Sequence, residues 1–226
     1  MHPALARTQL VICDLDGTLV DSIPDLAAAL DTAFEQSQLV PPGQSKARHW
    51  VGNGTEMLVK RALADAHEID EQQVDDLELS QVLGRFSRAY ADSPSRYSRL
   101  YPGVLRFLEW LKEAKVIVAL VTNKPNEFVG PVLKAVGIEE HFAMALGGDS
   151  LARKKPDPAP LLHVLERFDI AADNALMVGD SRSDIRAGKA AGVATLAVSY
   201  GYNHGEPIAR SEPDWIVDSL AELISD

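Results

Sequence analysis

From residue 101 onward the sequence alternates between apolar runs typical of buried strands and amphipathic runs typical of helices. The strand-like runs cover residues 116–121, 142–146, 175–178 and 194–198, and the helical runs cover residues 104–114, 127–136, 159–168 and 184–191. Another apolar run, residues 10–13, precedes them all. Parallel strands need a crossover helix between them, so this alternation predicts an α/β fold with a Rossmann-like, doubly wound parallel sheet.

Residues 21–96 interrupt the alternation and carry no strand signal. Helical patterns cover residues 22–34, 54–67 and 74–90, with Pro24 suited to a first turn and Ser93-Pro94-Ser95 typical of a linker. We therefore expect an α/β core made of residues 1–20 and 97–226, with a helical cap of residues 21–96 inserted after the first strand.

Composition indicates the cellular location of the protein and excludes some classes of partner. The 226 residues are 46% hydrophobic, enough for a sizeable core, and no apolar stretch approaches the roughly 20 residues of a membrane span. The single cysteine, Cys13, is expected to be a buried apolar side chain, and the N-terminus leaves no room for a signal peptide before the first strand. The net charge of −11 disfavours nucleic acid and anionic membranes as partners. We expect a cytoplasmic protein, either a monomer or a homodimer.

Four polar motifs follow the predicted strands or the connections between them. They are DLDGT (residues 14–18), TNKP (residues 122–125), KKPDP (residues 154–158) and GDSRSD (residues 179–184). The carboxyl ends of parallel strands face one ligand crevice, so these motifs are expected to meet there.

The residue types in these motifs suit phosphoryl transfer. Aspartates supply the oxygen ligands that Mg²⁺ prefers, and an aspartate can also attack phosphorus. The hydroxyl of Thr122 and nearby N–H groups can hold a phosphoryl group, and Lys155 can offset its charge. As alternatives, Asp16 could form only a turn, Thr122 and Asn123 a helix cap, and Asp184 the cap of its own helix.

The order DLDGT, VTN, KKPDP and GDSRSD resembles the haloacid-dehalogenase-like phosphohydrolase superfamily over the whole chain. The longer stretches DLDGTLVDS, VGNGTEMLVKRAL, LVTNKP, GGDSLARKKPDPAPLL, VGDSRSDIRAGKAAG and YGYNHGE are most similar to its bacterial members that hydrolyse 2-phosphoglycolate. One position departs from the pattern, since Cys13 stands where relatives often have an aromatic residue.

The resemblance implies a role for each matching residue. Asp14 would be the nucleophile, and Asp16 would protonate the leaving oxygen and then activate water. Mg²⁺ would be held by the Asp14 and Asp180 carboxylates and by the main-chain carbonyl of Asp16. Asp184 would either bind the ion directly or support one of its ligands. Thr122 and Asn123 would bind the phosphoryl group, and Lys155 matches the family's lysine better than Lys154.

The cap offers two candidates for contacts with the rest of the substrate. Gly54 belongs to a glycine-containing turn that lets the backbone come close, and Arg61 could bind a carboxylate. Alternatively, this is an ordinary helix turn with an exposed arginine. Lys124 is left open between a surface lysine and a residue of the site.

These inferences predict a Mg²⁺-dependent phosphatase that converts 2-phosphoglycolate, a small phosphorylated organic acid, to glycolate and phosphate through an aspartyl-phosphate. A phosphatase for another small phosphoester and a sugar-phosphate mutase of the same fold are alternatives. A phosphate-binding module without activity would not need Asp16, and a dehalogenase would need no Mg²⁺ site.

Overall fold

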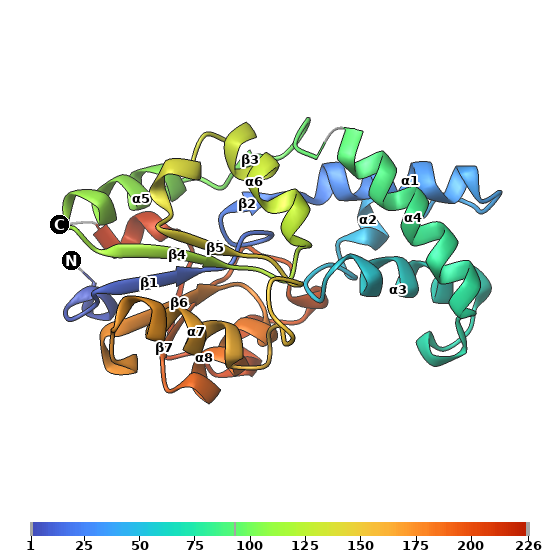
Figure 1. Ribbon diagram of the computed structural model, residues 1–226. Helices are drawn as coiled ribbons and strands as arrows, with labels where there is room; N and C mark the ends of the chain where they lie inside the picture. Colours follow the sequence, from blue (N-terminus) through green and yellow to red (C-terminus); the bar gives the residue numbers. More distant parts are fainter. Residues whose placement is uncertain (1, 93, 225–226) are drawn as a thin grey trace.

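The computed structural model describes residues 2–92 and 94–224, and its main feature is a six-stranded parallel sheet in the order β5-β4-β1-β6-β7-β8 (Figure 1). The strands are β1 (Leu10–Cys13), β4 (Ile117–Val121), β5 (Met144–Leu146), β6 (Ala175–Gly179), β7 (Ala194–Val198) and β8 (Trp215–Val217). The predicted α/β fold with a parallel sheet is confirmed. The short strand β8 was missed, because three residues are too few to show a periodic pattern.

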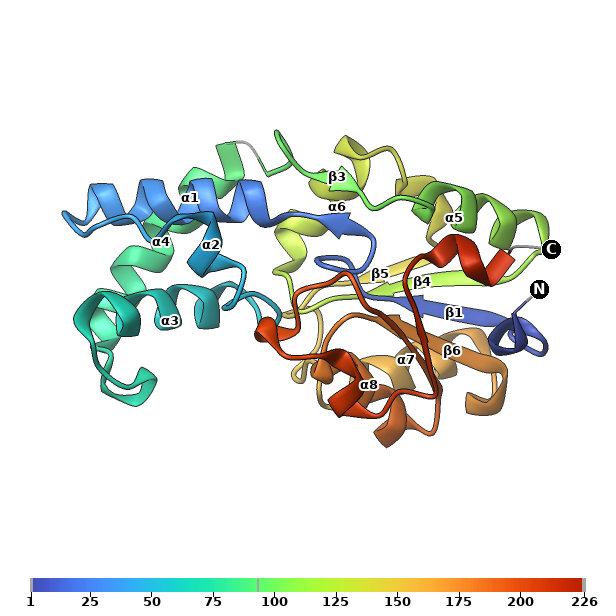
Figure 2. The same cartoon turned by 180° about the vertical axis from the view of Figure 1, so that it is seen from behind.

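Helices cover both faces of this sheet (Figures 1 and 2). One face carries α5 (Val104–Glu113), α6 (Asn126–Ala135) and the 3₁₀ turn Leu220–Ile224, and the other carries α7 (Ala159–Phe168) and α8 (Arg182–Ala191). Val11 and Cys13 pack in the first layer, while Leu10 and Ile12 pack in the second. Burial on both faces explains why β1 is a continuous apolar run rather than an alternating one.

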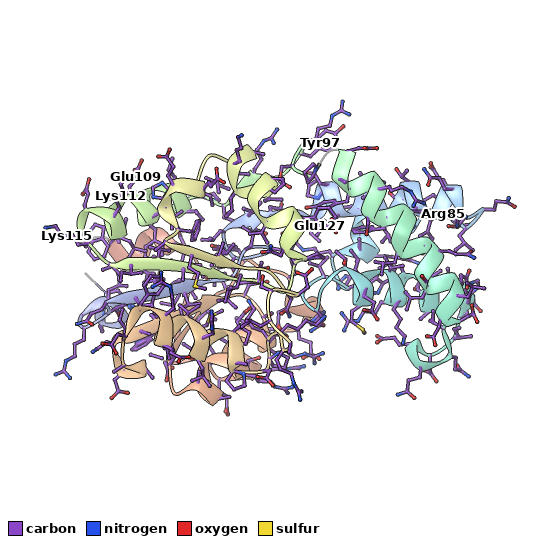
Figure 3. All side chains as sticks on the ribbon, in the orientation of Figure 1. Arg85, Tyr97, Glu109, Lys112, Lys115 and Glu127 are labelled. Carbon is purple, nitrogen blue, oxygen red and sulfur yellow. The ribbon has the colours of Figure 1, made fainter. Side chains whose placement is uncertain are left out.

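Helix α5 shows how the sequence pattern produces a layer. Phe107, Leu108 and Leu111 are fully buried against the sheet, whereas Glu109 and Lys112 are exposed and point away from it (Figure 3). Cys13 is buried as expected, and burial raises the pKa of its thiol to about 12, so the side chain stays neutral.

The helices between residues 22 and 92 form a separate group at one end of the molecule (Figures 1 and 2). They are α1 (Ile23–Gln36), α2 (Gly43–Ala47), α3 (Thr55–His67) and α4 (Asp76–Asp92), and they share one hydrophobic cluster. Only α2 was not predicted, because it follows Pro41-Pro42 and has a single turn's length. The predicted linker includes Ser93, which lies outside the described residues.

The chain enters and leaves this helical group through two adjacent segments. Strand β2 (Val20–Asp21) pairs antiparallel with β3 (Arg99–Leu100). Phe128 of α6 and Tyr202, which follows β7, pack into the hydrophobic cluster of the helical group. The remaining 3₁₀ turns are Pro3–Leu5, Glu71–Gln73, Glu139–His141, Ala172–Asn174, Asn203–Gly205 and Ile208–Ser211.

The strand order places a ligand crevice at the carboxyl end of β1. From β1 the chain builds β4 and β5 on one side and then crosses to build β6, β7 and β8 on the other. Ligands of open α/β sheets bind where the connections diverge in this way. Within residues 2–92 and 94–224, no helix combines the length and apolar character that crossing a membrane requires.

Candidate active site

Three buried carboxylates meet at the carboxyl end of the sheet. Asp14 follows β1, Asp180 follows β6, and Asp184 lies in the first turn of α8. One oxygen from each lies within 4.8 Å of the others, and the three residues are between 0% and 8% exposed. We call Asp14, Asp180 and Asp184 the carboxylate triad.

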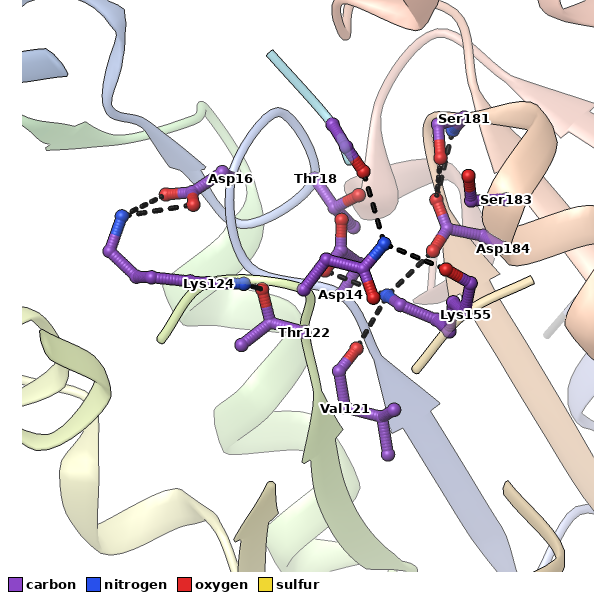
Figure 4. A network of polar contacts seen from close by, with 12 residues as sticks. Asp14, Asp16, Thr18, Val121, Thr122, Lys124, Lys155, Ser181, Ser183 and Asp184 are labelled. Atoms are coloured by element: carbon purple, nitrogen blue, oxygen red, sulfur yellow. Dashed lines mark hydrogen bonds and ion pairs between the residues drawn. The ribbon is translucent and has the colours of Figure 1, made fainter. Parts of the chain in front are cut away.

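One lysine faces the carboxylate triad. The Lys155 Nζ lies 2.8 Å from Asp14 Oδ1 and 2.7 Å from Asp184 Oδ1, and it also donates to the Val121 carbonyl (Figure 4). Burial by itself lowers the pKa of the Lys155 ammonium, but Asp14 and Asp184 outweigh it and hold that pKa above its ordinary value. Lys154 is exposed and donates to the Asn53 carbonyl, outside this cluster.

Local hydrogen bonds hold the triad in place. Ser181 donates from its N–H and its Oγ to Asp184 Oδ2 at 2.9 and 2.7 Å, so Asp184 caps its own helix as well as belonging to the triad. Thr18 Oγ1 donates to Asp180 Oδ1 at 2.9 Å. A Cβ on Gly17, whose φ is +90°, would lie 2.4 Å from Asp180 Oδ2, so this close approach requires glycine.

The triad carries more negative charge than its lysine can offset. Burial and the neighbouring Asp184 raise the pKa of Asp14 to about 6. Burial, Asp184 and Asp14 raise the pKa of Asp180 to about 8, against the hydrogen bonds from Tyr202 and Thr18. Three clustered oxygen donors of this kind are compatible with a divalent metal ion, which would favour their ionised forms.

In the metal-free protein we expect stability to fall as pH rises from about 4 to about 8. The folded-state pKa values of about 6 and about 8 exceed the ordinary aspartate value of 3.8, so the folded protein holds protons that the unfolded chain releases. The protons held by Asp14 and Asp180 therefore stabilise the folded state fully below pH 3.8. This stabilisation is lost as pH rises through the folded-state pKa values of about 6 and about 8. Urea melts in EDTA across this range measure the effect.

The matched control for this pH dependence is Asp180→Asn. This variant should lose most of the difference between the melts at low and high pH, and Mg²⁺ should flatten the curve of the parent protein. Equal pH dependence in the variant and the parent would contradict the assignment to the triad.

A pocket opens beside Asp14, between the sheet and the helical group. Its lining residues are Asp14, Asp16, Leu26, Val51, Gly52, Gly54, Thr55, Leu58, Thr122, Asn123 and Lys124. Asn123 Nδ2 donates to the carbonyls of Lys155 at 2.9 Å and Gly52 at 3.2 Å, which ties the sheet edge to the helical group. The structure thus brings Thr122, Asn123 and Gly54 together with Asp14 and Asp16.

Asp16 points away from the carboxylate triad. Its two oxygens lie 3.0 and 2.9 Å from the Nζ of Lys124, on the opposite side of Asp14 from Lys155 and Asp184 (Figure 4). The Lys124 side chain is 1% exposed, so the surface alternative for this residue is wrong. The sequence showed a polar residue after a strand but could not show which carboxylate would reach it.

Arg61 is not brought into this pocket. Its Nη1 donates to the Trp50 carbonyl at 2.8 Å, its Nη2 to Asn53 Oδ1 at 2.9 Å, and its Nε lies 3.2 Å from Glu71 Oε1. It lines a separate cavity instead, and its side chain is only 14% exposed, so the alternative of an exposed arginine does not hold either.

Arg61 supports a loop that also touches the core. Asn53 Nδ2 donates to Ser183 Oγ at 3.2 Å, beside the triad residue Asp184. The Asn53 side chain and Thr18 were not singled out from the sequence, although Thr18 closes the DLDGT motif and the backbone of residues 52–55 was a candidate for substrate contacts.

Comparisons with known proteins agree with this fold. A family model described as "Haloacid dehalogenase-like hydrolase" matches residues 11–198, most of the chain. The chain belongs to the haloacid dehalogenase-like hydrolase family. Within that class it is an enzyme of the phosphatase type, as its relatives indicate.

Three similar proteins illustrate the relationship. The phosphoglycolate phosphatase of Pseudomonas fluorescens is 49% identical over 216 residues, covering 96% of this chain and 78% of that protein. The phosphoglycolate phosphatase of Nitrosococcus oceani is 46% identical over 219 residues, covering 97% and 96%. The crystal structure of a "predicted phosphoglycolate phosphatase" from Haemophilus somnus superposes with a TM-score of 0.91 at 40% identity, covering 97% of this chain and 98% of that chain.

Proposed function

We propose that this phosphatase hydrolyses 2-phosphoglycolate to glycolate and phosphate, with Mg²⁺ as cofactor and through an aspartyl-phosphate on Asp14. The observation that carries the chemistry is the position of Asp14, which belongs to the carboxylate triad and also lines the pocket. The substrate is supported by the relatives named phosphoglycolate phosphatase, at 46% to 49% identity.

In the proposed reaction the Asp14 carboxylate attacks phosphorus and the bond to the ester oxygen breaks. Asp16, which lines the same pocket, gives its proton to that oxygen and later takes one from the water that cleaves the aspartyl-phosphate. Thr122 and Asn123 hold the phosphoryl oxygens, and Lys155 orients Asp14 through their ion pair.

Asp14, the main-chain carbonyl of Asp16, Asp180 and Asp184 would hold the Mg²⁺. The ion, when bound, supplies positive charge that offsets the repulsion between the Asp14 carboxylate and the phosphate dianion. The remote position of the Asp16 carboxylate, paired with Lys124, agrees with the use of its main-chain oxygen instead.

We further propose that residues 21–96 act as a cap over a core of residues 1–20 and 97–226. The 50–54 loop supports this role, because Gly52 and Gly54 line the pocket and Asn53 contacts Ser183 of the core. A cap closed in this way would exclude water while Asp14 attacks.

Phosphate release from a panel of small phosphoesters, with Mg²⁺ and with excess EDTA, tests the function. We expect 2-phosphoglycolate to have the highest kcat/KM and EDTA to abolish its hydrolysis. A different leading ester would overturn the substrate, and undiminished activity in EDTA would overturn the role of Mg²⁺. Absence of hydrolysis with Mg²⁺ present would contradict the proposed reaction altogether.

A further inference from the structure

Lys124 is a buried cation that the proposed reaction does not use. Its ammonium group lies 2.9 Å from Asp16 and 4.9 Å above the ring centre of Tyr90, a residue of α4. Burial of a lysine is costly and needs a compensating anion, here Asp16. The core and the helical group thus jointly fix an ammonium group at the wall of the pocket.

Lys124 lies on the side of the pocket where the leaving group must be. In the proposed reaction the phosphoryl group lies at Asp14, whose other neighbours are Lys155 and Asp184, and the ester oxygen faces Asp16 (Figure 4). The rest of the leaving group therefore extends past Asp16 towards its partner, Lys124. In 2-phosphoglycolate a single methylene separates the ester oxygen from the carboxylate, so the carboxylate reaches this region.

Among the described residues that line the pocket, Lys124 alone is cationic. The other candidate for binding a carboxylate, Arg61, has its guanidinium engaged by Trp50, Asn53 and Glu71 outside the pocket. Lys155 already forms ion pairs with Asp14 and Asp184 of the carboxylate triad.

We propose that Lys124 binds the carboxylate of the substrate and so makes the enzyme selective for small phosphorylated carboxylic acids. The substrate carboxylate takes the place of Asp16 as the partner of Lys124, and Asp16 is left facing the ester oxygen. An ammonium group buried in a pocket favours an anionic leaving group over a neutral one of the same size, because only the anion replaces the lost ion pair. This inference rests on the proposed function and assigns its specificity to one residue.

The test is the ratio of two kcat/KM values, that for 2-phosphoglycolate divided by that for ethyl phosphate. Ethyl phosphate has the same ester linkage and no carboxylate. In Lys124→Met we expect this ratio to fall by about 100-fold, mainly through a higher KM for 2-phosphoglycolate, as for loss of one partner of a buried charge pair. Lys112→Met is the matched control, since it removes the same charge from an exposed position of α5 outside the pocket, and it should change the ratio by less than about threefold.

The outcomes separate this inference from the proposed function. A parent enzyme that prefers 2-phosphoglycolate, with a ratio that Lys124→Met leaves within threefold, overturns the role of Lys124 and leaves the function standing. A parent enzyme with no preference for 2-phosphoglycolate over ethyl phosphate overturns both. If Lys124→Met does not fold, as circular dichroism would reveal, Lys124→Gln keeps a hydrogen-bond donor to Asp16 without the charge, and the same fall in ratio is expected.

Discussion

Replacing Asp14 by asparagine is expected to lower kcat by roughly 10⁴-fold or more, the scale of loss when a nucleophile is removed. The amide has nearly the shape of the carboxylate but is a far weaker nucleophile towards phosphorus. It also takes one negative charge from the carboxylate triad, which weakens Mg²⁺ binding, but more Mg²⁺ should not rescue the activity because the attacking carboxylate itself is missing. Steady-state phosphate release, with the amount of folded protein checked by circular dichroism, measures the loss.

Asp173→Asn is the control for this experiment. Asp173 is an exposed residue of the turn Ala172–Asn174, so the same chemical change there should leave kcat within about twofold. A folded Asp14→Asn variant with more than a tenth of the parent activity would show that another group attacks phosphorus.

Replacing Lys155 by methionine is expected to affect both stability and turnover. Without the ammonium group, Asp14 and Asp184 lose the cation that lies 2.8 and 2.7 Å from them and face each other unpaired in a buried site. Removing one partner of a buried ion pair destabilises a protein by about 3–5 kcal/mol. Turnover should fall by about 10²- to 10³-fold, because Asp14 loses the group that orients it.

Urea unfolding in EDTA and in Mg²⁺ separates these two effects. Mg²⁺ should recover part of the lost stability, since it also neutralises the triad, but it should not restore turnover. Lys112→Met, which changes an exposed lysine of α5, should match the parent in both measurements. Equal unfolding midpoints for Lys155→Met and the parent in EDTA would contradict the ion-pair network.

Most of the sheet could be predicted because its strands are buried on both faces. Residues 10–13 and 194–198 are strands with the predicted bounds, and α7 spans the predicted residues 159–168. What escaped prediction is short: α2 and the strands β2, β3 and β8 have between two and five residues, and their contacts rather than their patterns determine them.

The assembly of the site could also be predicted, but its internal pairing could not. Asp14, Thr122 and Asp180 follow strands β1, β4 and β6, and parallel strands bring those positions to one edge. The partners of Lys124 and Arg61 depend instead on how the helical group packs on the sheet. Asp16 and Tyr90 reach Lys124 from distant parts of the chain, and no local pattern records such contacts.

The most direct test of the covalent mechanism is the pre-steady-state reaction of Asp16→Asn with an excess of ³²P-labelled 4-nitrophenyl phosphate. Nitrophenolate is a good leaving group and needs no proton from residue 16, so Asp14 can still attack. Without the Asp16 carboxylate, water is not activated and the aspartyl-phosphate should persist. The account predicts a burst of about one nitrophenolate per enzyme, with ³²P on the protein at Asp14. Release of nitrophenolate and phosphate together, with no protein-bound ³²P at any time, would contradict it.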